Sequence, residues 1–155
     1  MPRIHVCSLA LIGETVEETG ARSLVTLLNP GTRVVRPKPI APDRHLYIGV
    51  ADIVEAQPGQ VLPAETHVRE LIAFAGVSRS TAAAFISACA LAPRRDEGEI
   101  ALALRAASPT ATPNPRLVAL ADAVLGRAGR MTKVIEAIGR GQECFEGAPF
   151  ALEIG

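Results

Sequence analysis

Strand-like segments occupy only the first third of this chain, and helical periodicity replaces them after Pro63. Short apolar runs with β-branched residues span Ile4 to Leu9, Leu24 to Leu28 and His45 to Val50. Between the first two runs, Glu14 to Gly20 has the pattern of a short acidic helix that ends at a glycine. This order predicts a β-α-β unit followed by a third strand, which together make only a thin sheet.

Helical stripes fill the remainder of the chain. Apolar residues recur at helical spacing from Val68 to Ala75, and Pro63 suits the first turn of that helix. Further segments show the same spacing: Ser80 to Ala92, Glu97 to Ala107, Pro115 to Arg127 and Met131 to Gly139. Strands followed by helices predict an α/β fold with a small, twisted central sheet covered by helices and a helical C-terminal half.

Length and charge limit the classes of protein to which the chain can belong. The 155 residues, 48% of them hydrophobic, can bury a real core, so residues 1–155 are expected to form a single domain. No run reaches the roughly 18 consecutive apolar residues of a membrane helix. The 16 basic and 16 acidic residues cancel, so no net field attracts nucleic acid or an anionic membrane. An anion-binding site would therefore have to depend on a local group of positive charges rather than on the net charge of the chain.

The cysteines and the start of the chain indicate the compartment. An odd and sparse set of cysteines argues against a disulfide-bonded scaffold: Cys7, Cys89 and Cys144. The opening residues, MPRIHVCSL, lack the cationic region and apolar run of a secretory signal. We therefore expect a bacterial-type cytoplasmic protein with free thiols.

Two other sets of polar residues carry no predicted site. The histidines have no carboxylate or thiol at ligand spacing, so a metal centre has no support: His5, His45 and His67. The stretch Arg94 to Glu97 mixes both signs of charge at a helix start, which is typical of a solvated face.

The segment Gly76-Val77-Ser78-Arg79-Ser80 runs directly into an apolar helix. Amides at a helix start carry partial positive charge, Gly76 lets the backbone approach a ligand, and Arg79 offers a planar fork that suits phosphate. The segment therefore predicts a phosphate-binding loop. The plainer alternative is that Ser78 or Ser80 only caps the helix while Arg79 lies in solvent.

The same string is similar to a DNA-binding motif. Ala75 to Thr81 resembles the turn and the start of the recognition helix in the helix-turn-helix of bacterial repressors. A recognition helix presents polar or basic groups to base edges, whereas Ala82 to Cys89 is nearly all apolar. The neutral chain also lacks the basic charge that supplies most DNA affinity. A helix-turn-helix regulator is therefore the third interpretation, and we expect no nucleic-acid partner.

A second resemblance is to the cysteine-dependent protein tyrosine and dual-specificity phosphatases. Their signature is His-Cys, five residues, Arg and then Ser or Thr, and Gly76 to Ser80 resembles its second half. The segment Val50 to Ile53 is similar to the part of the family that carries the general-acid aspartate. Arg105, Pro113-Asn114 and Leu117 resemble the pattern that follows the signature. The resemblance spans roughly Leu24 to Leu125.

The resemblance implies a fold, a reaction and residue roles. The fold would be a phosphatase-like, three-layer α/β architecture, and the reaction would be hydrolysis of phosphate monoesters through a cysteinyl-phosphate without a metal or other cofactor. Arg79 and the amides from Gly76 to Ser80 would bind the phosphoryl group, and Ser80 would stabilise the thiolate as it leaves. Asp52, or Glu55 in its place, would protonate the leaving group. A protein, a phosphoinositide or a small phosphate ester all fit as substrate, and both a monomer and a dimer stay open.

The first half of the signature is missing from the chain. Six positions before Arg79 stands Ala73, and the residue before it is Ile72, so neither the cysteine nor the histidine is present. Cys89 lies almost three helical turns beyond the loop, and the other two cysteines are equally misplaced for attack on a phosphate. As printed, the chain is therefore expected to be inert.

The join between Ala75 and Gly76 is also unusual for such a fold. The helical stripe that ends at Ala75 runs straight into the loop, where the family has a helix end, a turn, a strand of about five or six residues and then His-Cys. We therefore expect a segment to be omitted between Ala75 and Gly76. The alternative is a pseudophosphatase that keeps Arg79 and the loop amides, binds phosphate or sulfate ions, and forms no covalent intermediate.

Overall fold

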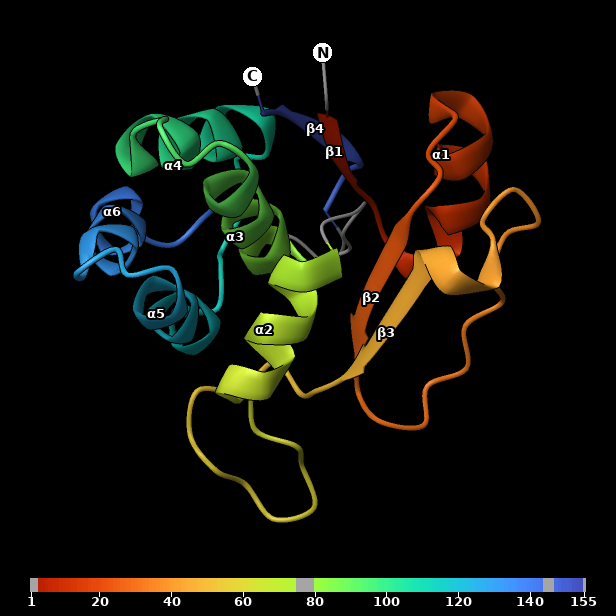
Figure 1. Cartoon of the computed structure of the whole chain (residues 1–155), viewed down its shortest axis with the longest axis horizontal. Coiled ribbons are helices and arrows are strands. Elements are labelled where there is room, and N and C mark those ends of the chain that lie inside the picture. The colour runs from red at the N-terminus through yellow and green to blue at the C-terminus, as the bar shows by residue number, and fades with distance from the viewer. Residues whose placement is uncertain (1–2, 75–79, 144–146, 155) are drawn as a thin grey trace.

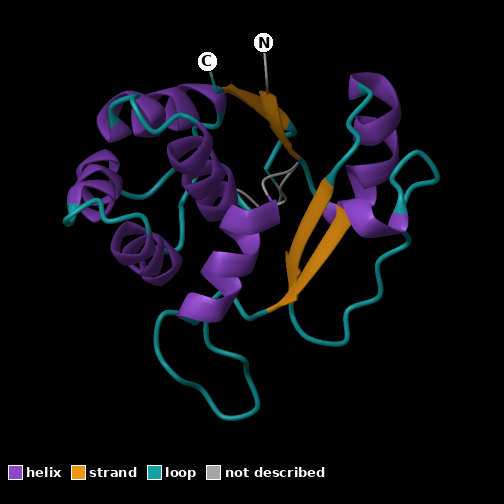
Figure 2. Cartoon of the chain, viewed as in Figure 1, coloured by secondary structure: helices purple, strands orange, loops and turns teal. Residues whose placement is uncertain are grey.

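The structure is a computed structural model, and it describes residues 3–74, 80–143 and 147–154. Helices and strands are both present, and the C-terminal half is mainly helical (Figures 1 and 2). The elements in chain order are β1 (Arg3–Val6), η1 (Leu9–Leu11), α1 (Ile12–Thr19), β2 (Leu24–Leu28), η2 (Pro42–Arg44), β3 (His45–Gly49), α2 (Glu65–Phe74), α3 (Thr81–Leu91), α4 (Glu97–Ala107), α5 (Pro115–Val124), α6 (Arg130–Ile138) and β4 (Phe150–Glu153). The predicted mixed α/β class is confirmed.

The strands form two small sheets, so the expected single, thin central sheet is wrong for the described residues. β1 pairs antiparallel with β4, and β2 pairs parallel with β3 in the register Leu24 opposite His45. The sequence interpretation missed β4 because four residues near the end of the chain give too short an alternation to recognise. The partner of β1 therefore comes from the far end of the chain rather than from the β-α-β unit.

Helices cover both faces of β2. Successive strand residues point to opposite faces, and the side chain of Leu24 packs with Ile12 and Val16 of α1. Val25, on the other face, belongs to the main core together with Val68 of α2. The structure thus places α1 on one side of this sheet and the remaining helices on the other, as Figure 1 shows.

α3 is the central helix of the molecule. Every residue from Ala82 to Cys89 is at most 1% exposed, and the helix packs against α2, α4, α5 and β1. A helix that is apolar all round belongs in a core, and its many alanines let neighbouring helices approach closely. No helix in the described part of the chain is both long and apolar enough to cross a lipid bilayer.

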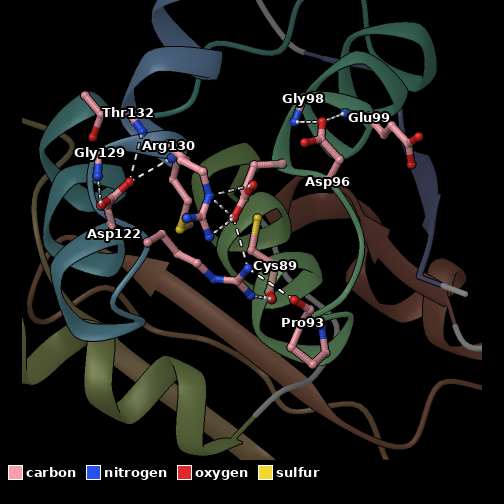
Figure 3. Close-up of polar contacts among 12 residues, drawn as sticks. Cys89, Pro93, Asp96, Gly98, Glu99, Asp122, Gly129, Arg130 and Thr132 are labelled. Atoms are coloured by element: carbon pink, nitrogen blue, oxygen red, sulfur yellow. Dashed lines mark hydrogen bonds and ion pairs between the residues drawn. The ribbon is translucent and has the colours of Figure 1, made fainter.

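A buried carboxylate ties the far end of α3 to its neighbours. Glu97, at the start of α4, is only 4% exposed, so the expectation that it lies on a solvated face is wrong. Arg127 donates to Glu97 Oε1 at 2.9 Å and to the carbonyl of Cys89 in α3 at 2.8 Å. Arg130 donates to both oxygens of Glu97 at 3.3 Å (Figure 3). The three side chains connect α3, α4 and the start of α6.

A second buried carboxylate fixes the turn that carries those arginines. Asp122 is 5% exposed and accepts from the backbone amides of Gly129 at 2.6 Å and Met131 at 2.7 Å (Figure 3). Because α6 begins after a glycine, which has no capping side chain, Asp122 of α5 satisfies these amides instead. The carboxylate of Asp122 therefore fixes the turn from which Arg127 and Arg130 reach Glu97.

Replacing Glu97 with alanine leaves the buried guanidinium of Arg127 without its carboxylate. We expect Glu97→Ala to lower the free energy of unfolding by about 3 kcal/mol, since breaking a buried ion pair is strongly destabilising. Glu99→Ala is the matched control, because Glu99 lies in the same helical turn but forms an exposed pair with Arg95. The control should change stability by less than about 0.5 kcal/mol in urea denaturation. Equal effects of the two variants would contradict the role of Glu97.

The stability that Glu97 contributes should depend on pH. Burial alone would raise the pKa of Glu97, but the hydrogen bond from Arg130 and the charges of both arginines outweigh it, so the pKa lies below its ordinary value of 4.5. A carboxylate with a depressed folded-state pKa contributes fully above pH 4.5, and the contribution disappears as the pH falls through the folded-state pKa. The difference in unfolding free energy between the wild type and Glu97→Gln should therefore be largest at neutral pH and shrink in acid. A difference that stays constant down to low pH would contradict this assignment.

Candidate functional site

A pocket of about 390 Å³ lies at the carboxyl ends of β2 and β3. Its walls come from the ends of both strands, the start of α3 and the start of α5. The lining residues are Leu27, Leu28, Asn29, Val50, Ala51, Asp52, Ser80, Thr81, Thr112, Asn114 and Leu117. Polar groups from segments far apart in the sequence therefore meet in one place, which is typical of a ligand site at the end of parallel strands.

Ser80 brings the start of the central helix to this pocket. It is the N-cap of α3, in an extended conformation with φ −110° and ψ 133°, and its Oγ accepts from the amide of Ala83 at 3.4 Å. The first turn of a helix has amides without intrahelical acceptors and carries partial positive charge. The pocket therefore receives the positive end of a helix that is otherwise buried.

Asp52 also lines the pocket and is held by Asn114. The amide nitrogen Nδ2 of Asn114 donates to Asp52 Oδ1 at 2.7 Å and to the carbonyl of Ile53 at 3.3 Å. The amide oxygen of Asn114 accepts from the backbone amides of Arg116 at 3.0 Å and Leu117 at 3.1 Å, which caps α5. One buried side chain thus joins the start of α5 to the carboxylate in the pocket.

The end of the long loop between β3 and α2 is hydrogen-bonded to α5. The guanidinium of Arg116 donates from Nε to the carbonyl of Pro63 at 2.8 Å, and the amide of Ala51 donates to the carbonyl of Val61 at 2.8 Å. The loop projects from the body of the molecule (Figure 1). Glu55 belongs to this loop, is exposed and is not among the residues that line the pocket. Asp52 lines the pocket, whereas Glu55 does not. The role of Glu55 as a substitute acid stays a prediction.

The structure brings together part of the predicted site. Asp52 and Ser80, 28 positions apart, line the same pocket. Of the remaining predicted phosphate-binding residues, Gly76, Val77, Ser78 and Arg79 lie outside the described residues, as does the junction between Ala75 and Gly76. Their roles stay predictions.

Arg105 has a structural role in the described contacts. Its guanidinium donates to the carbonyls of Ile138 at 2.8 Å and Gly139 at 2.7 Å, which closes the end of α6, and to the carbonyl of Ala111 at 2.9 Å. These bonds hold the loop before Asn114 against α4 and α6. Arg105 therefore supports the segment that leads to the pocket and does not line it.

The cysteines in the described part of the chain are buried and are not among the residues that line the pocket. Cys89 is 1% exposed, and burial raises the pKa of its thiol to about 12 against the opposing charge of Arg127. Cys7 is 6% exposed and packs beside α1. Cys144 lies outside the described residues. Both the burial of Cys89 and its raised pKa disfavour the thiolate, which is the form of cysteine that acts as a nucleophile.

Sequence reasoning found Asp52 and Ser80 but missed how Asn114 acts. Asn114 before Pro115 is a recognisable helix start, because asparagine is a preferred N-cap and proline a preferred first residue. Its bond to Asp52 spans 62 positions and leaves no local signal in the sequence. Within residues 3–74, 80–143 and 147–154, no three His, Cys, Asp or Glu side chains come together in an arrangement that could hold a metal ion.

Comparison with known proteins adds no family to this description. No protein-family model, no curated protein sequence and no solved structure gives a significant match to the chain.

Replacing Asn114 separates its two functions. Asn114→Ala removes both the helix cap and the bond to Asp52, and we expect it to lower the free energy of unfolding by about 2 kcal/mol. Asn114→Ser keeps an oxygen that can cap α5 but loses the Nδ2 donor, so it should cost about half as much. Urea denaturation measures both, with Asn29→Ala as a control at an exposed position of the same pocket. Equal losses for the alanine and serine variants would show that the cap is not what Asn114 contributes.

Proposed function

We propose that this chain is a phosphatase-like, three-layer α/β domain whose pocket binds phosphate monoesters. With the omitted segment present, the protein hydrolyses phosphotyrosine-type substrates through a cysteinyl-phosphate intermediate. Without that segment the printed chain binds the phosphoryl group and does not turn it over.

The observation that carries this proposal is the meeting of three residues at one pocket. Asp52, Ser80 and Asn114 each belong to a different part of the phosphatase resemblance, and all three line the cavity at the strand ends. They approach it from three separate elements, and the start of the buried helix α3 adds partial positive charge. A carboxylate in the same pocket as an anion-attracting helix end suits proton transfer to the leaving group of a phosphate ester.

In the proposed reaction, a thiolate attacks phosphorus in line and the bond to the ester oxygen breaks. Asp52 gives its proton to the departing oxygen, and it then takes a proton from the water that attacks the phosphocysteine and releases inorganic phosphate. Asn114 holds one oxygen of Asp52, so the carboxylate reaches the pocket in a fixed orientation. Ser80, next to the thiolate, would stabilise it as the leaving group in the second step.

A phosphate-binding module without catalysis is the second candidate, and the described thiols favour it for the chain as printed. Neither Cys7 nor Cys89 lines the pocket, and the raised pKa of Cys89 keeps its thiol protonated. The third interpretation, a DNA-binding regulator, is disfavoured because the candidate recognition helix α3 is buried from Ala82 to Cys89 and has no face to present to a groove.

Hydrolysis of para-nitrophenyl phosphate tests the proposed reaction. We expect turnover by the protein with a segment containing the His-Cys pair restored between Ala75 and Gly76, and none by the printed chain. In the restored protein, Asp52→Asn should lower kcat by about 100-fold or more on an ester with a poor leaving group. Glu55→Gln tests the alternative acid: because Glu55 is not among the residues that line the pocket, we expect little change in kcat, and a loss as large as that of Asp52→Asn would assign the proton to Glu55 instead.

Binding of inorganic phosphate to the printed chain, followed by titration calorimetry, separates the two candidates. Phosphate binding without turnover, in both the printed and the restored protein, favours the binding module. Neither binding nor turnover in the restored protein would remove the phosphatase assignment.

A further inference from the structure

Another cavity, which we call the arginine groove, lies near the amino ends of β2 and β3. Its volume is about 810 Å³, and small-molecule sites commonly enclose about 300–1,000 Å³. Its walls come from α1 with the turn that follows it, and from the segment before β3. Among its lining residues are Val16, Glu17, Arg22, Pro39, Ala41 and Arg44. The groove shares no lining residue with the pocket that contains Asp52 and Ser80.

Hydrogen bonds and buried anchors fix both walls of the arginine groove. At the end of α1, the amide of Gly20 donates to the carbonyl of Val16 at 3.0 Å. In the other wall, the amide of Arg44 donates to the carbonyl of Ala41 at 2.9 Å, and the neighbouring Ile40 is fully buried. A groove whose walls are already ordered loses little conformational entropy when a ligand binds.

Apolar groups make up the floor of the arginine groove. Val16 is only 2% exposed and belongs to a small hydrophobic cluster with Ile40, and Ala21 packs against the same cluster. Ala21, Pro39 and Ala41 all line the groove and have no polar side-chain atom. Their small size leaves room above the cluster. Such a surface suits the apolar part of a ligand.

Two arginines of the groove have no partner within the protein. Arg22 stands two positions before β2 and Arg44 immediately before β3, and Leu24 lies opposite His45 in the register of these strands. Both arginines are exposed, and neither guanidinium forms a hydrogen bond or ion pair with any described residue. Arginines elsewhere donate to carbonyls or carboxylates, as shown by Arg105, Arg116 and Arg127. Two free guanidinium groups therefore line one apolar groove.

The charges of the groove suit a ligand with a single negative charge. Glu17 also lines it, and no ion pair joins Glu17 to Arg22 or Arg44 among the residues that the structure describes. Two guanidinium groups and one carboxylate give the lining a net charge of +1. A monoanion balances this charge, whereas a phosphate dianion would exceed it and be repelled by Glu17. The planar guanidinium group also matches the geometry of a carboxylate.

We propose that the arginine groove binds a small monocarboxylate with an apolar tail, of the medium-chain fatty-acid type. Arg22 and Arg44 bind the carboxylate, and the tail lies on Val16, Pro39 and Ala41. The phosphate pocket lies at the other ends of the same strands, roughly 15 Å away for strands of five residues. The groove is therefore a separate site and does not rest on the phosphatase reaction.

Titration calorimetry of the chain with sodium octanoate tests the two arginines. We expect a dissociation constant of about 1 mM or below. Arg22→Gln and Arg44→Gln should each weaken binding by about tenfold or more, because each removes charge-assisted hydrogen bonds to the carboxylate. Arg33→Gln is the matched control, since Arg33 is also exposed and without a partner among the described residues but does not line the groove. Absence of octanoate binding, or equal affinity in all three variants, would overturn the proposal.

Ligand analogues and a filled groove test the apolar tail. Acetate has the carboxylate alone and 1-octanol has the tail alone, so each should bind at least about tenfold more weakly than octanoate. Ala41→Leu keeps both arginines but occupies the floor, and it should weaken octanoate binding. Ala56→Leu is its control at an exposed position outside the groove. Octanol binding as tight as octanoate binding, or no effect of Ala41→Leu, would contradict the assigned ligand.

Backbone NMR distinguishes the arginine groove from the phosphate pocket. Octanoate should shift the amide signals of positions 20–22 and 41–44 and leave those of Asp52 and Ser80 unchanged. Inorganic phosphate should not displace it. Shifts at Asp52 and Ser80, or displacement by phosphate, would place octanoate in the other pocket and overturn this inference. Failure of phosphate to bind at all would count against the proposed function and leave the arginine groove intact.

Discussion

The rest of the structure depends on the burial of α3. This helix touches α2, α4, α5 and β1, and its small side chains let all of them approach it. Both of its ends are tied by polar contacts: Ser80 caps the start at the pocket, and Arg127 binds the carbonyl of Cys89 near the end while pairing with Glu97. Arg127 thus joins the end of α3 to Glu97 of α4, while Ser80 at the start of α3 lines the pocket.

The pocket itself is built on helix ends rather than on free loops. Asn114 satisfies the first amides of α5 with its oxygen and holds Asp52 with its nitrogen, so the same side chain stabilises a helix and orients a carboxylate. Arg116 fastens the other end of the loop that carries Asp52. Groups positioned in this way lose little conformational entropy when a ligand binds.

The helices could be predicted from the sequence because their causes are local. Apolar spacing, an N-cap such as Asp96 or Asn114, and a glycine after α1 each act within one turn. The pairing of the strands could not be predicted, because β1 pairs with a strand about 150 positions away and that strand, β4, is only four residues long. Glu97 was misjudged for the same reason. Beside Arg95 it resembles a solvated charge, and its real partners, Arg127 and Arg130, follow about 30 positions later.

The sequence by itself determined the mixed α/β class and the order of the helices and the first three strands, and it predicted phosphate chemistry from residues that include Asp52 and Ser80. A motif with fixed spacing can be counted directly, so the sequence also showed that the chain lacks the His-Cys half of the phosphatase signature that it resembles. Only the tertiary structure decided that Asp52, Ser80 and Asn114 share one pocket, and that the strands described separate into two sheets. Local patterns set the conformation of each segment, whereas the meeting of distant segments depends on which buried surfaces and backbone groups satisfy one another best.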